Sequence, residues 1–243
     1  MSKFPTPNFS IDLSDDVALV TGATSGLGWR FAEVLAACGA RVAICGRREE
    51  RLRELTKVIE DNGGECLPIV MDMTDRESIR NGVDSAEAAF GTVNILVNNA
   101  GIPDAAWAVK MDDSHFDRVM ETNLEGPWIL STEVAKRLMK QEQSGRMVNI
   151  ASVAAYNTNG DSAAALYATT KAAVVRMTEA LACEWARFNI NVNCIAPGAF
   201  KTEMLDGMFE RMGDFSGTFP RKRALDPAQM DSTLLYLVSP ASE

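Results

Sequence analysis

The stretch that decides the fold is Val17-Ala-Leu-Val-Thr-Gly-Ala-Thr-Ser-Gly-Leu-Gly28. Its first four residues are apolar and predict a short buried strand, while apolar residues at helical spacing after Gly26 predict a helix. A strand that turns through glycines into a helix directs free backbone N–H groups, and the positive end of the helix dipole, at whatever lies above the turn. The stretch therefore predicts a unit that binds the phosphates of a dinucleotide or a similar ligand.

The three glycines of this turn have separate expected roles. Gly22 permits the sharp turn, Gly26 leaves room for a pyrophosphate, and Gly28 lets the helix lie close to the strand. Their pattern, T-G-x-x-x-G-x-G, departs from the G-x-G-x-x-G fingerprint. Trp29 follows Gly28 where a P-loop has lysine, which disfavours a nucleoside triphosphatase. A tight turn with no ligand is the alternative interpretation.

Composition excludes several classes of protein. The chain has 243 residues, of which 47% are hydrophobic and 23% charged, as is typical of a soluble globular protein. The net charge of −9 and the lack of a basic run disfavour nucleic acid as a partner. No apolar run approaches the ~18–20 residues of a membrane span. The five cysteines include no C-x-x-C pair, so we expect no metal site and a cytoplasmic location.

Strand and helix patterns alternate along the whole chain. This alternation predicts an α/β fold, a single-domain, Rossmann-type doubly wound parallel sheet with strand order 3-2-1-4-5-6. Residues 1–16 are expected to form an N-terminal arm before a domain over 17–243. The expected strands are 17–20, 41–45, 65–70, 94–97, 147–150 and 191–195. The later expected helices are 49–62, 75–90, 114–141 (interrupted at Gly126-Pro127), 164–188 and 226–238.

Two side chains with proton chemistry share one face of an expected helix. Tyr167 and Lys171 are four residues apart. A nearby ammonium lowers the pKa of a phenol, and such a phenol can give a proton to a carbonyl oxygen or take one from an alcohol. Ser152 follows an expected strand, so its hydroxyl lies at the same sheet edge as the glycine turn. The single histidine, His115, is remote in sequence, which disfavours a serine hydrolase. Taken singly, these residues are also compatible with a surface pair and a loop serine.

Taken together, the motifs resemble those of the short-chain dehydrogenase/reductase family. The resemblance extends from Val17 to Ser239 and depends on residues in the family's order: Thr21 to Gly28, Asn98 to Gly101, Asn123, Ser152, Tyr167, Lys171 and Pro197-Gly198.

The resemblance implies four catalytic residues. Tyr167 is implied to be the general acid/base, and Lys171 to hold the cofactor ribose and lower the pKa of Tyr167. Ser152 is implied to orient the reacting oxygen, and Asn123 to support a water that connects Lys171 to solvent. A hydride then passes between nicotinamide C4 and the substrate carbon.

The family's cofactor contacts are implied on matching residues. Tyr167 and Lys171 belong to this set as well as to the catalytic one. The others are Gly22, Ser25, Gly26, Leu27, Gly28, Asp72, Met73, Asn99, Ala100, Gly101, Pro197, Gly198, Phe200 and Thr202.

The end of the second strand predicts which cofactor is used. An acidic residue there accepts hydrogen bonds from the ribose hydroxyls of NAD. This chain has Arg47 and Arg48 instead, and two guanidinium groups can grip a 2′-phosphate. We therefore expect NADP (NADPH/NADP+). The alternative is that Arg48 only begins the next helix.

The family resemblance also predicts a substrate lid over residues 203–219. This segment is rich in methionine and phenylalanine, whose flexible or apolar side chains suit an adaptable pocket. An amphipathic helix that packs its own apolar stripe is the alternative. The residues expected to contact substrate are Ser152, Tyr156, Tyr167, Met204 and Met208.

Two departures from the family pattern affect these expectations. Ser152 and Tyr167 are two residues further apart than is commonest, so residues 156–165 are expected to loop out. The family's usual seventh strand is absent from the sequence, which predicts that 191–195 is an exposed edge and that the chain is shortened at this end.

The expected function is NADP-dependent hydride transfer between nicotinamide and a carbonyl compound or secondary alcohol. A 3-oxoacyl-carrier-protein reductase and a sugar or polyol dehydrogenase are alternatives within the family. An NADP-binding sensor without chemistry and a methyltransferase are alternatives outside it. The helices expected at 114–141 and 164–188 have small or apolar faces, and the family resemblance implies that these helices pair across a two-fold axis, so a homodimer or homotetramer is expected.

Overall fold

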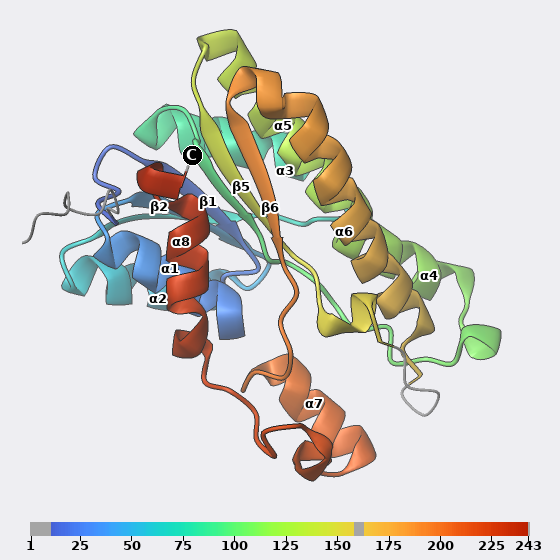
Figure 1. The fold of residues 1–243 in the computed structure, drawn as a ribbon. Helices are drawn as coiled ribbons and strands as arrows, with labels where there is room; N and C mark the ends of the chain where they lie inside the picture. The colour runs from blue at the N-terminus through green and yellow to red at the C-terminus, as the bar shows by residue number, and fades with distance from the viewer. Residues whose placement is uncertain (1–10, 158–162, 243) are drawn as a thin grey trace, which may run out of the picture.

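The structure, a computed structural model, describes residues 11–157 and 163–242. In this part of the chain six parallel strands form one sheet in the order β3-β2-β1-β4-β5-β6, so the predicted fold class and strand order are confirmed (Figure 1). The expected N-terminal arm lies outside the described residues before Ile11. The strands are β1 (Val17–Thr21), β2 (Arg41–Gly46), β3 (Glu65–Val70), β4 (Ile95–Asn98), β5 (Gly145–Ile150) and β6 (Ile190–Ile195).

Helices cover both faces of the sheet. In β1, Ala18 and Val20 pack into a core with α1, α2 and α8, whereas Val17 and Leu19 pack into a second core with α3, α5 and α6. The central strand is buried on both faces, which explains why its sequence is a continuous apolar run. The helices are α1 (Gly26–Ala37), α2 (Glu49–Asp61), α3 (Arg76–Phe90), α4 (Asp113–Met120), α5 (Gly126–Gln141), α6 (Ala165–Trp185), α7 (Glu203–Met212) and α8 (Asp231–Val238).

The long helix expected over 114–141 forms in two parts that are joined by a widened turn. Between α4 and α5, residues Glu121–Glu125 adopt a π-helical turn. Pro127 lies at the start of α5 and has no N–H, so the wider turn avoids the clash with the preceding carbonyl that a regular α-helix would produce. This turn carries Asn123.

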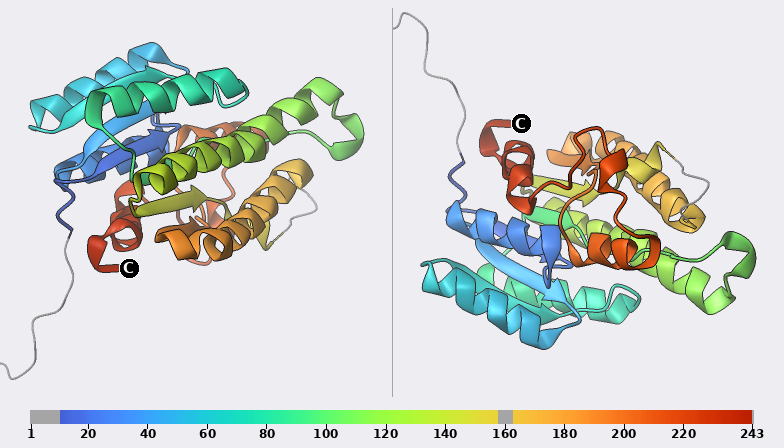
Figure 2. Two further views of the ribbon diagram at one scale, coloured as in Figure 1. Left: turned by 90° about the horizontal axis from the view of Figure 1, so that it is seen from above. Right: turned by 90° about the horizontal axis from the view of Figure 1, so that it is seen from below.

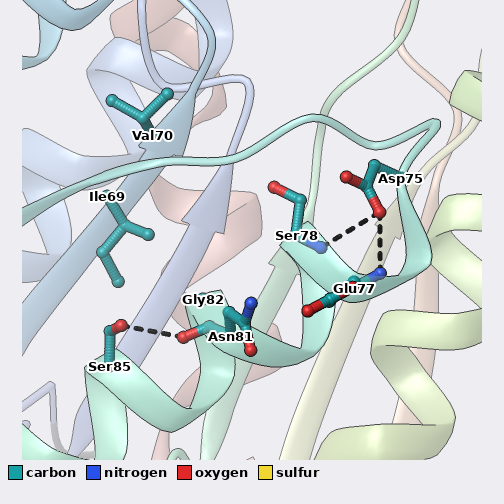
Figure 3. Close-up of a pocket in the computed structure, with 8 residues that line it drawn as sticks. All are labelled: Ile69, Val70, Asp75, Glu77, Ser78, Asn81, Gly82 and Ser85. Atoms are coloured by element: carbon teal, nitrogen blue, oxygen red, sulfur yellow. Dashed lines mark hydrogen bonds between the residues drawn. The ribbon is translucent and has the colours of Figure 1, made fainter.

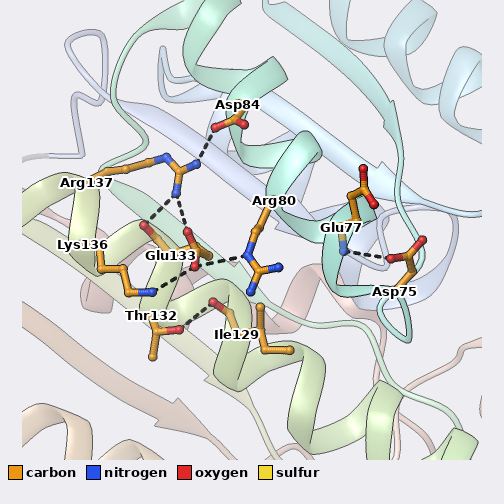
Figure 4. Close-up of polar contacts among 9 residues, drawn as sticks. All are labelled: Asp75, Glu77, Arg80, Asp84, Ile129, Thr132, Glu133, Lys136 and Arg137. Atoms are coloured by element: carbon orange, nitrogen blue, oxygen red, sulfur yellow. Dashed lines mark hydrogen bonds and ion pairs between the residues drawn. The ribbon is translucent and has the colours of Figure 1, made fainter.

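Ion pairs fasten α5 to α3 (Figure 4). Arg137 of α5 binds Asp84 and Glu87 of α3, and its Nη1 lies 3.0 Å from Glu133 Oε2 one helical turn earlier. Asp75 caps α3 by accepting from the N–H of Glu77 at 2.8 Å. The ion pairs of Arg137 thus hold α5, the helix that follows the widened turn, against α3.

The last part of the chain differs from the expectation in detail. The helix expected at 226–238 is a 3₁₀ turn, Pro227–Met230, followed by α8. Within the described residues no seventh strand lies beside β6, and the chain passes from α8 into a final turn at Pro240–Ser242. None of the described helices has the length and apolarity to cross a membrane.

All six strands are parallel, so their carboxyl ends share one edge of the sheet. The glycine turn follows β1, Asn98–Gly101 follow β4, Ser152 follows β5, and Pro197-Gly198 follow β6. Helix α7 lies beyond this edge, at the bottom of Figure 1 and in front of the sheet in the right-hand view of Figure 2. The residues singled out in the sequence therefore meet at the edge where ligands bind in such sheets.

Candidate active site

The glycine turn has the geometry that its sequence predicts. Gly22 and Gly26 have φ angles of 65° and 57°, in the left-handed region that favours glycine. A Cβ atom on Gly28 would lie 2.3 Å from the carbonyl oxygen of Gly22, so only glycine lets α1 approach the turn this closely. Ser25 is the N-cap of α1 and makes no side-chain capping bond. The backbone N–H groups of the first turn of α1, including that of Leu27, therefore have no side-chain acceptor at the carboxyl edge of the sheet.

Thr21 joins the glycine turn to the loop after β4. Its Oγ1 accepts hydrogen bonds from the backbone N–H groups of Asn99 and Ala100, both at 3.0 Å. In the opposite direction, Nδ2 of Asn99 donates to the carbonyl oxygens of Thr21 at 2.9 Å and Gly22 at 3.2 Å. Two of the segments expected around the cofactor are thus held against each other by side chains at the strand ends.

Ser152 and Tyr167 lie together although 15 residues separate them. Ser152 caps a short 3₁₀ turn, Val153–Ala155, with its Oγ accepting from Ala154 N at 3.1 Å. Ser152 also lowers the pKa of Tyr167, so its side chain is a neighbour of the phenol. Residues 158–162 of the loop expected to bulge between them lie outside the described residues. The structure therefore places two hydroxyl groups side by side at the carboxyl edge of the sheet.

Lys171 lies one turn after Tyr167 and is 4% exposed. Its Nζ donates to the carbonyl oxygen of Ile150 at 2.8 Å and lies 5.7 Å from the centroid of the Tyr167 ring. Burial lowers the pKa of Lys171 from 10.5 to about 8. Lysine, tyrosine and serine thus form one cluster at the ends of β5 and α6.

The pKa of Tyr167 differs in direction from the expectation. The pKa is raised from 10, chiefly because the phenol is buried, and the negative charge of Asp104 raises it further. The hydrogen bond with Ser152 acts in the opposite direction but is outweighed. The spacing of Tyr167 and Lys171 could be seen in the sequence, whereas burial of the phenol decides the direction of the pKa shift.

Asn123 is fully buried and its side chain binds protein groups. Its Oδ1 accepts from Ile102 N at 2.8 Å, and its Nδ2 donates to Ile102 O at 2.9 Å and to Thr170 Oγ1 at 3.2 Å. These bonds pin the loop after β4 to α6. A Cβ on Gly101 would lie 3.2 Å from Lys171 Nζ and 3.4 Å from Asn123 Oδ1, so both side chains face this glycine.

The two arginines expected to select the cofactor differ in their contacts with the rest of the protein. Arg47 is exposed. Arg48 begins α2 as its N-cap, and its guanidinium also reaches the glycine turn, with Nη2 2.8 Å from Thr24 Oγ1. Its Nη1 forms an ion pair with Glu203 of α7 at 2.9 Å. Arg48 therefore begins the helix, as the alternative interpretation expected, and its contact with a 2′-phosphate stays a prediction.

Other residues expected at the cofactor divide into open and buried positions. Gly198 is exposed, and a Cβ there would meet nothing within 4 Å. Asp72 is half-buried, and its Oδ1 accepts from Thr74 N at 2.9 Å. Met73 and Phe200 differ from the expectation, since both side chains pack into the two cores and leave chiefly backbone atoms for a ligand. Pro197 is buried beside Ser152, with its carbonyl accepting from Val153 N at 3.0 Å.

The expected lid consists of α7 and a 3₁₀ turn at Ser216–Thr218. Thr202 caps α7 and lies against the glycine turn, since a Cβ on Gly26 would be 2.8 Å from its Cγ2. Met204 and Met208 are half-buried, and Tyr156 is 68% exposed. Part of the apolar stripe of this segment packs on itself. The ring of Phe215 makes edge-to-face contacts with those of Phe209 and Phe219, at 5.1 and 5.5 Å between ring centroids.

A separate pocket of about 340 Å³ lies between β3 and α3 (Figure 3). Its lining includes Ile69, Asp75 and Asn81, and none of the expected catalytic residues. Among the described residues, no group of three or more His, Cys, Asp or Glu side chains is arranged to hold a metal ion. The chemistry-bearing cluster therefore remains the one at the strand ends.

A comparison with known families agrees with this geometry. The sequence model described as short chain dehydrogenase matches residues 16–213. The chain belongs to the short-chain dehydrogenase family. This assignment disfavours the methyltransferase alternative.

Members of the short-chain dehydrogenase family resemble the chain over most of its length. The 3-oxoacyl-[acyl-carrier-protein] reductase FabG of Rickettsia conorii is 37% identical over 201 residues, which are 83% of this chain and 79% of that protein. A short-chain type dehydrogenase/reductase from Mycobacterium marinum has a TM-score of 0.91 at 32% identity, covering 96% of this chain and 91% of its own. Actinorhodin polyketide ketoreductase, crystallised with NADPH, has a TM-score of 0.88 at 34% identity, covering 93% and 91%.

Several polar residues of this short-chain dehydrogenase were not singled out from the sequence as members of one network. Asn98 Nδ2 donates to Asn149 Oδ1 and to Ser131 Oγ, both at 2.8 Å, and Asn149 Nδ2 donates to Thr178 Oγ1 at 2.9 Å. A polar residue within an otherwise apolar strand was the available signal, because a buried amide needs partners. The network links β4 and β5 to α5 and to α6, the helix that carries Tyr167 and Lys171.

Burial of Lys171 predicts a pH-dependent contribution to stability. The unfolded chain binds more protons than the folded chain between pH 8 and 10.5, so this lysine makes the free energy of unfolding rise with pH over that window. We expect the stability of Lys171→Met relative to wild type to fall by about 3 kcal/mol as pH rises from 8 to 10.5. Urea unfolding at several pH values measures this difference. Lys140→Met, at an exposed lysine of α5, should show no such change, and a pH-independent difference for Lys171→Met would contradict the prediction.

Proposed function

We propose that the protein is an NADP-dependent oxidoreductase that interconverts a carbonyl compound and a secondary alcohol, with Tyr167 as the general acid/base. The observation that carries this proposal is the cluster at the carboxyl edge, where Nζ of the buried Lys171 lies 5.7 Å from the centroid of the Tyr167 ring and Ser152 is a neighbour of the phenol. A binding protein without chemistry has no need of two adjacent hydroxyl groups with a buried lysine one turn away.

The roles of the three side chains follow from their proton chemistry. Reduction of a carbonyl requires a proton at the oxygen, and the phenol of Tyr167 donates it. The hydroxyl of Ser152 gives a second hydrogen bond to the same oxygen and stabilises the negative charge that develops there. Lys171 holds the ribose and keeps a positive charge near the phenol. Bound NADPH would supply the hydride.

The residues present fit a dinucleotide phosphate. The start of α1 has no side-chain cap and offers backbone N–H groups, and Thr202 lies against Gly26 at this point. Gly198 borders open space on the far side of the edge. The guanidinium of Arg48 lies at the end of β2, where the adenosine ribose of a dinucleotide binds in this fold. The ketoreductase crystallised with NADPH supports the same cofactor.

Replacing Arg48 tests the preference for NADP. A charge-assisted contact to a 2′-phosphate contributes about 1.5–3 kcal/mol, so Arg48→Gln should weaken NADP+ binding by about 10- to 100-fold and leave NAD+ binding nearly unchanged. Titration calorimetry with both dinucleotides measures the two Kd values. Arg53→Gln, which removes an exposed guanidinium of the same helix, is the matched control. Tighter binding of NAD+ than of NADP+ by the wild-type protein would overturn the preference.

The activity itself is tested by loss of NADPH absorbance with a panel of ketones, keto sugars and 3-oxoacyl thioesters. Turnover of any class supports the proposal, and binding of NADPH with no turnover across the panel supports the sensor alternative. The 3-oxoacyl thioesters are the second candidate, because the relative from Rickettsia conorii bears that name. Three exposed basic residues after the lid, Arg221, Lys222 and Arg223, can meet an acidic carrier.

The assembly and location stay predictions. We propose a homodimer or homotetramer formed through α4, α5 and α6, and its support is the apolar surface of the first two helices. Phe116 of α4 is 46% exposed and Trp128 of α5 is 48% exposed. The molecular mass in solution, measured by light scattering, tests this assembly. Small-molecule substrates and a cytoplasmic location are likewise proposed.

A further inference from the structure

A buried carboxylate in the loop after β4 binds the start of the helix that carries Tyr167. Asp104 is 1% exposed. Its Oδ2 accepts from the backbone N–H of Leu166 at 2.9 Å and of Tyr167 at 3.2 Å, and its Oδ1 accepts from Ala105 N at 2.8 Å. We propose that Asp104 is a positioning residue that caps α6 from a distant loop and thereby places the phenol of Tyr167 beside Ser152. The proposal rests on the function proposed above.

Helix α6 lacks a capping side chain of its own. Its N-cap is Ala164, which has no side-chain oxygen and makes no capping bond. The first N–H groups of a helix need acceptors, and a carboxylate there is also stabilised by the helix dipole. Asp104, 62 residues before Leu166, supplies this acceptor and removes the freedom of the first turn.

The backbone next to Asp104 indicates that this placement is enforced. Ala105 has a φ of 51°, a left-handed conformation that alanine adopts only where surrounding contacts compensate for its strain. Its N–H is one of the three donors to the Asp104 carboxylate. The same carboxylate thus holds the strained Ala105 and caps α6.

The carboxylate also acts on the phenol through its charge. Two neighbouring side chains change the pKa of the phenol: Ser152 lowers it and the negative charge of Asp104 raises it. Lys171 also faces the ring, with its Nζ 5.7 Å from the ring centroid. Asp104 raises the pKa of Tyr167, which keeps the phenol protonated. A protonated phenol is the form that donates to a carbonyl oxygen, so Asp104 favours the reductive direction.

Two variants separate the cap from the charge. Asp104→Ala removes both, and a displaced phenol should lower kcat by about 10- to 100-fold with the Kd for NADPH little changed. Asp104→Asn keeps an acceptor oxygen and loses the charge, so it should retain more of kcat. In Asp104→Asn the ionisation of Tyr167 should also move to lower pH. Asp112→Asn is the matched control, because Asp112 caps α4 in the same way, accepting from His115 N at 2.8 Å, without facing Tyr167.

Spectroscopic titration of tyrosinate provides a readout that does not need turnover. The chain has three tyrosines, so the difference from Tyr167→Phe isolates the phenol of Tyr167. A shift to lower pH in Asp104→Asn supports the proposal even if no substrate of the panel is reduced. Two results together would overturn the proposal: the ionisation of Tyr167 stays at the same pH in Asp104→Asn, and kcat is unchanged in Asp104→Ala. If the wild-type protein still reduces a substrate, the proposed function remains intact.

Discussion

Tyr167→Phe should lower kcat for carbonyl reduction by about 10²- to 10⁴-fold, the range that a positioned proton donor contributes. Phenylalanine keeps the ring at the start of α6 and removes only the hydroxyl that neighbours Ser152. The substrate oxygen then develops negative charge with no donor of a proton at that point. Binding of NADPH should be nearly unchanged, because the phosphate contacts that we propose come from the glycine turn and Arg48.

Stopped-flow measurement of NADPH oxidation under single-turnover conditions separates this loss from changes in product release. Tyr236→Phe is the matched control, since Tyr236 is 60% exposed on α8 and removal of its hydroxyl should change kcat by less than about twofold. Retention of more than a tenth of wild-type kcat by Tyr167→Phe would assign the proton to another group.

Removal of the Asp16 charge should destabilise the protein by about 3–5 kcal/mol. Asp16 and Arg146 form an ion pair in which both side chains are 8% exposed. Asp16 Oδ1 also accepts from Asn94 Nδ2 at 2.7 Å, and Arg146 Nη1 donates to the carbonyl of Val238 at 2.8 Å. The pair therefore joins the starts of β1, β4 and β5 to the end of α8. Asp16→Asn leaves a buried guanidinium without a counter-charge.

Urea unfolding of Asp16→Asn, Arg146→Met and the double variant measures this effect. The double variant should regain part of the loss, because it buries no unpaired charge. Lys57→Met breaks an exposed pair with Asp61 and should cost at most about 0.5 kcal/mol. A cost for Asp16→Asn as small as that of Lys57→Met would show that water reaches the Arg146 guanidinium.

The sheet could be predicted from the sequence because its signals are local. Continuous apolar runs bounded by glycine, such as Val17–Val20, mark strands that are buried on both faces, and helical patterns between them require a parallel sheet. The strand order followed from that alternation. Pro127 also marked an interruption, but the sequence could not show that the helix continues through a widened turn that carries Asn123.

The parts that could not be predicted depend on partners far apart in the chain. Asp104 is a single acidic residue in an irregular loop, and nothing local indicates that it caps a helix 62 residues later. The spacing of Tyr167 and Lys171 showed that they share a face, but the direction of the phenol's pKa follows from burial, which only packing determines. Met73 and Phe200 were matched by position, whereas their side chains turn into the core.

The buried asparagines of β4 and β5 have a consequence for how the strands find their alignment. Asn98 and Asn149 are directly paired across the two strands. If either strand slipped by one residue, its own amide would turn to the opposite face, and both amides would be buried without their partner. The pair therefore favours the native register of β4 and β5 over slipped registers during folding. The register in turn sets the positions at which the loops after these strands begin.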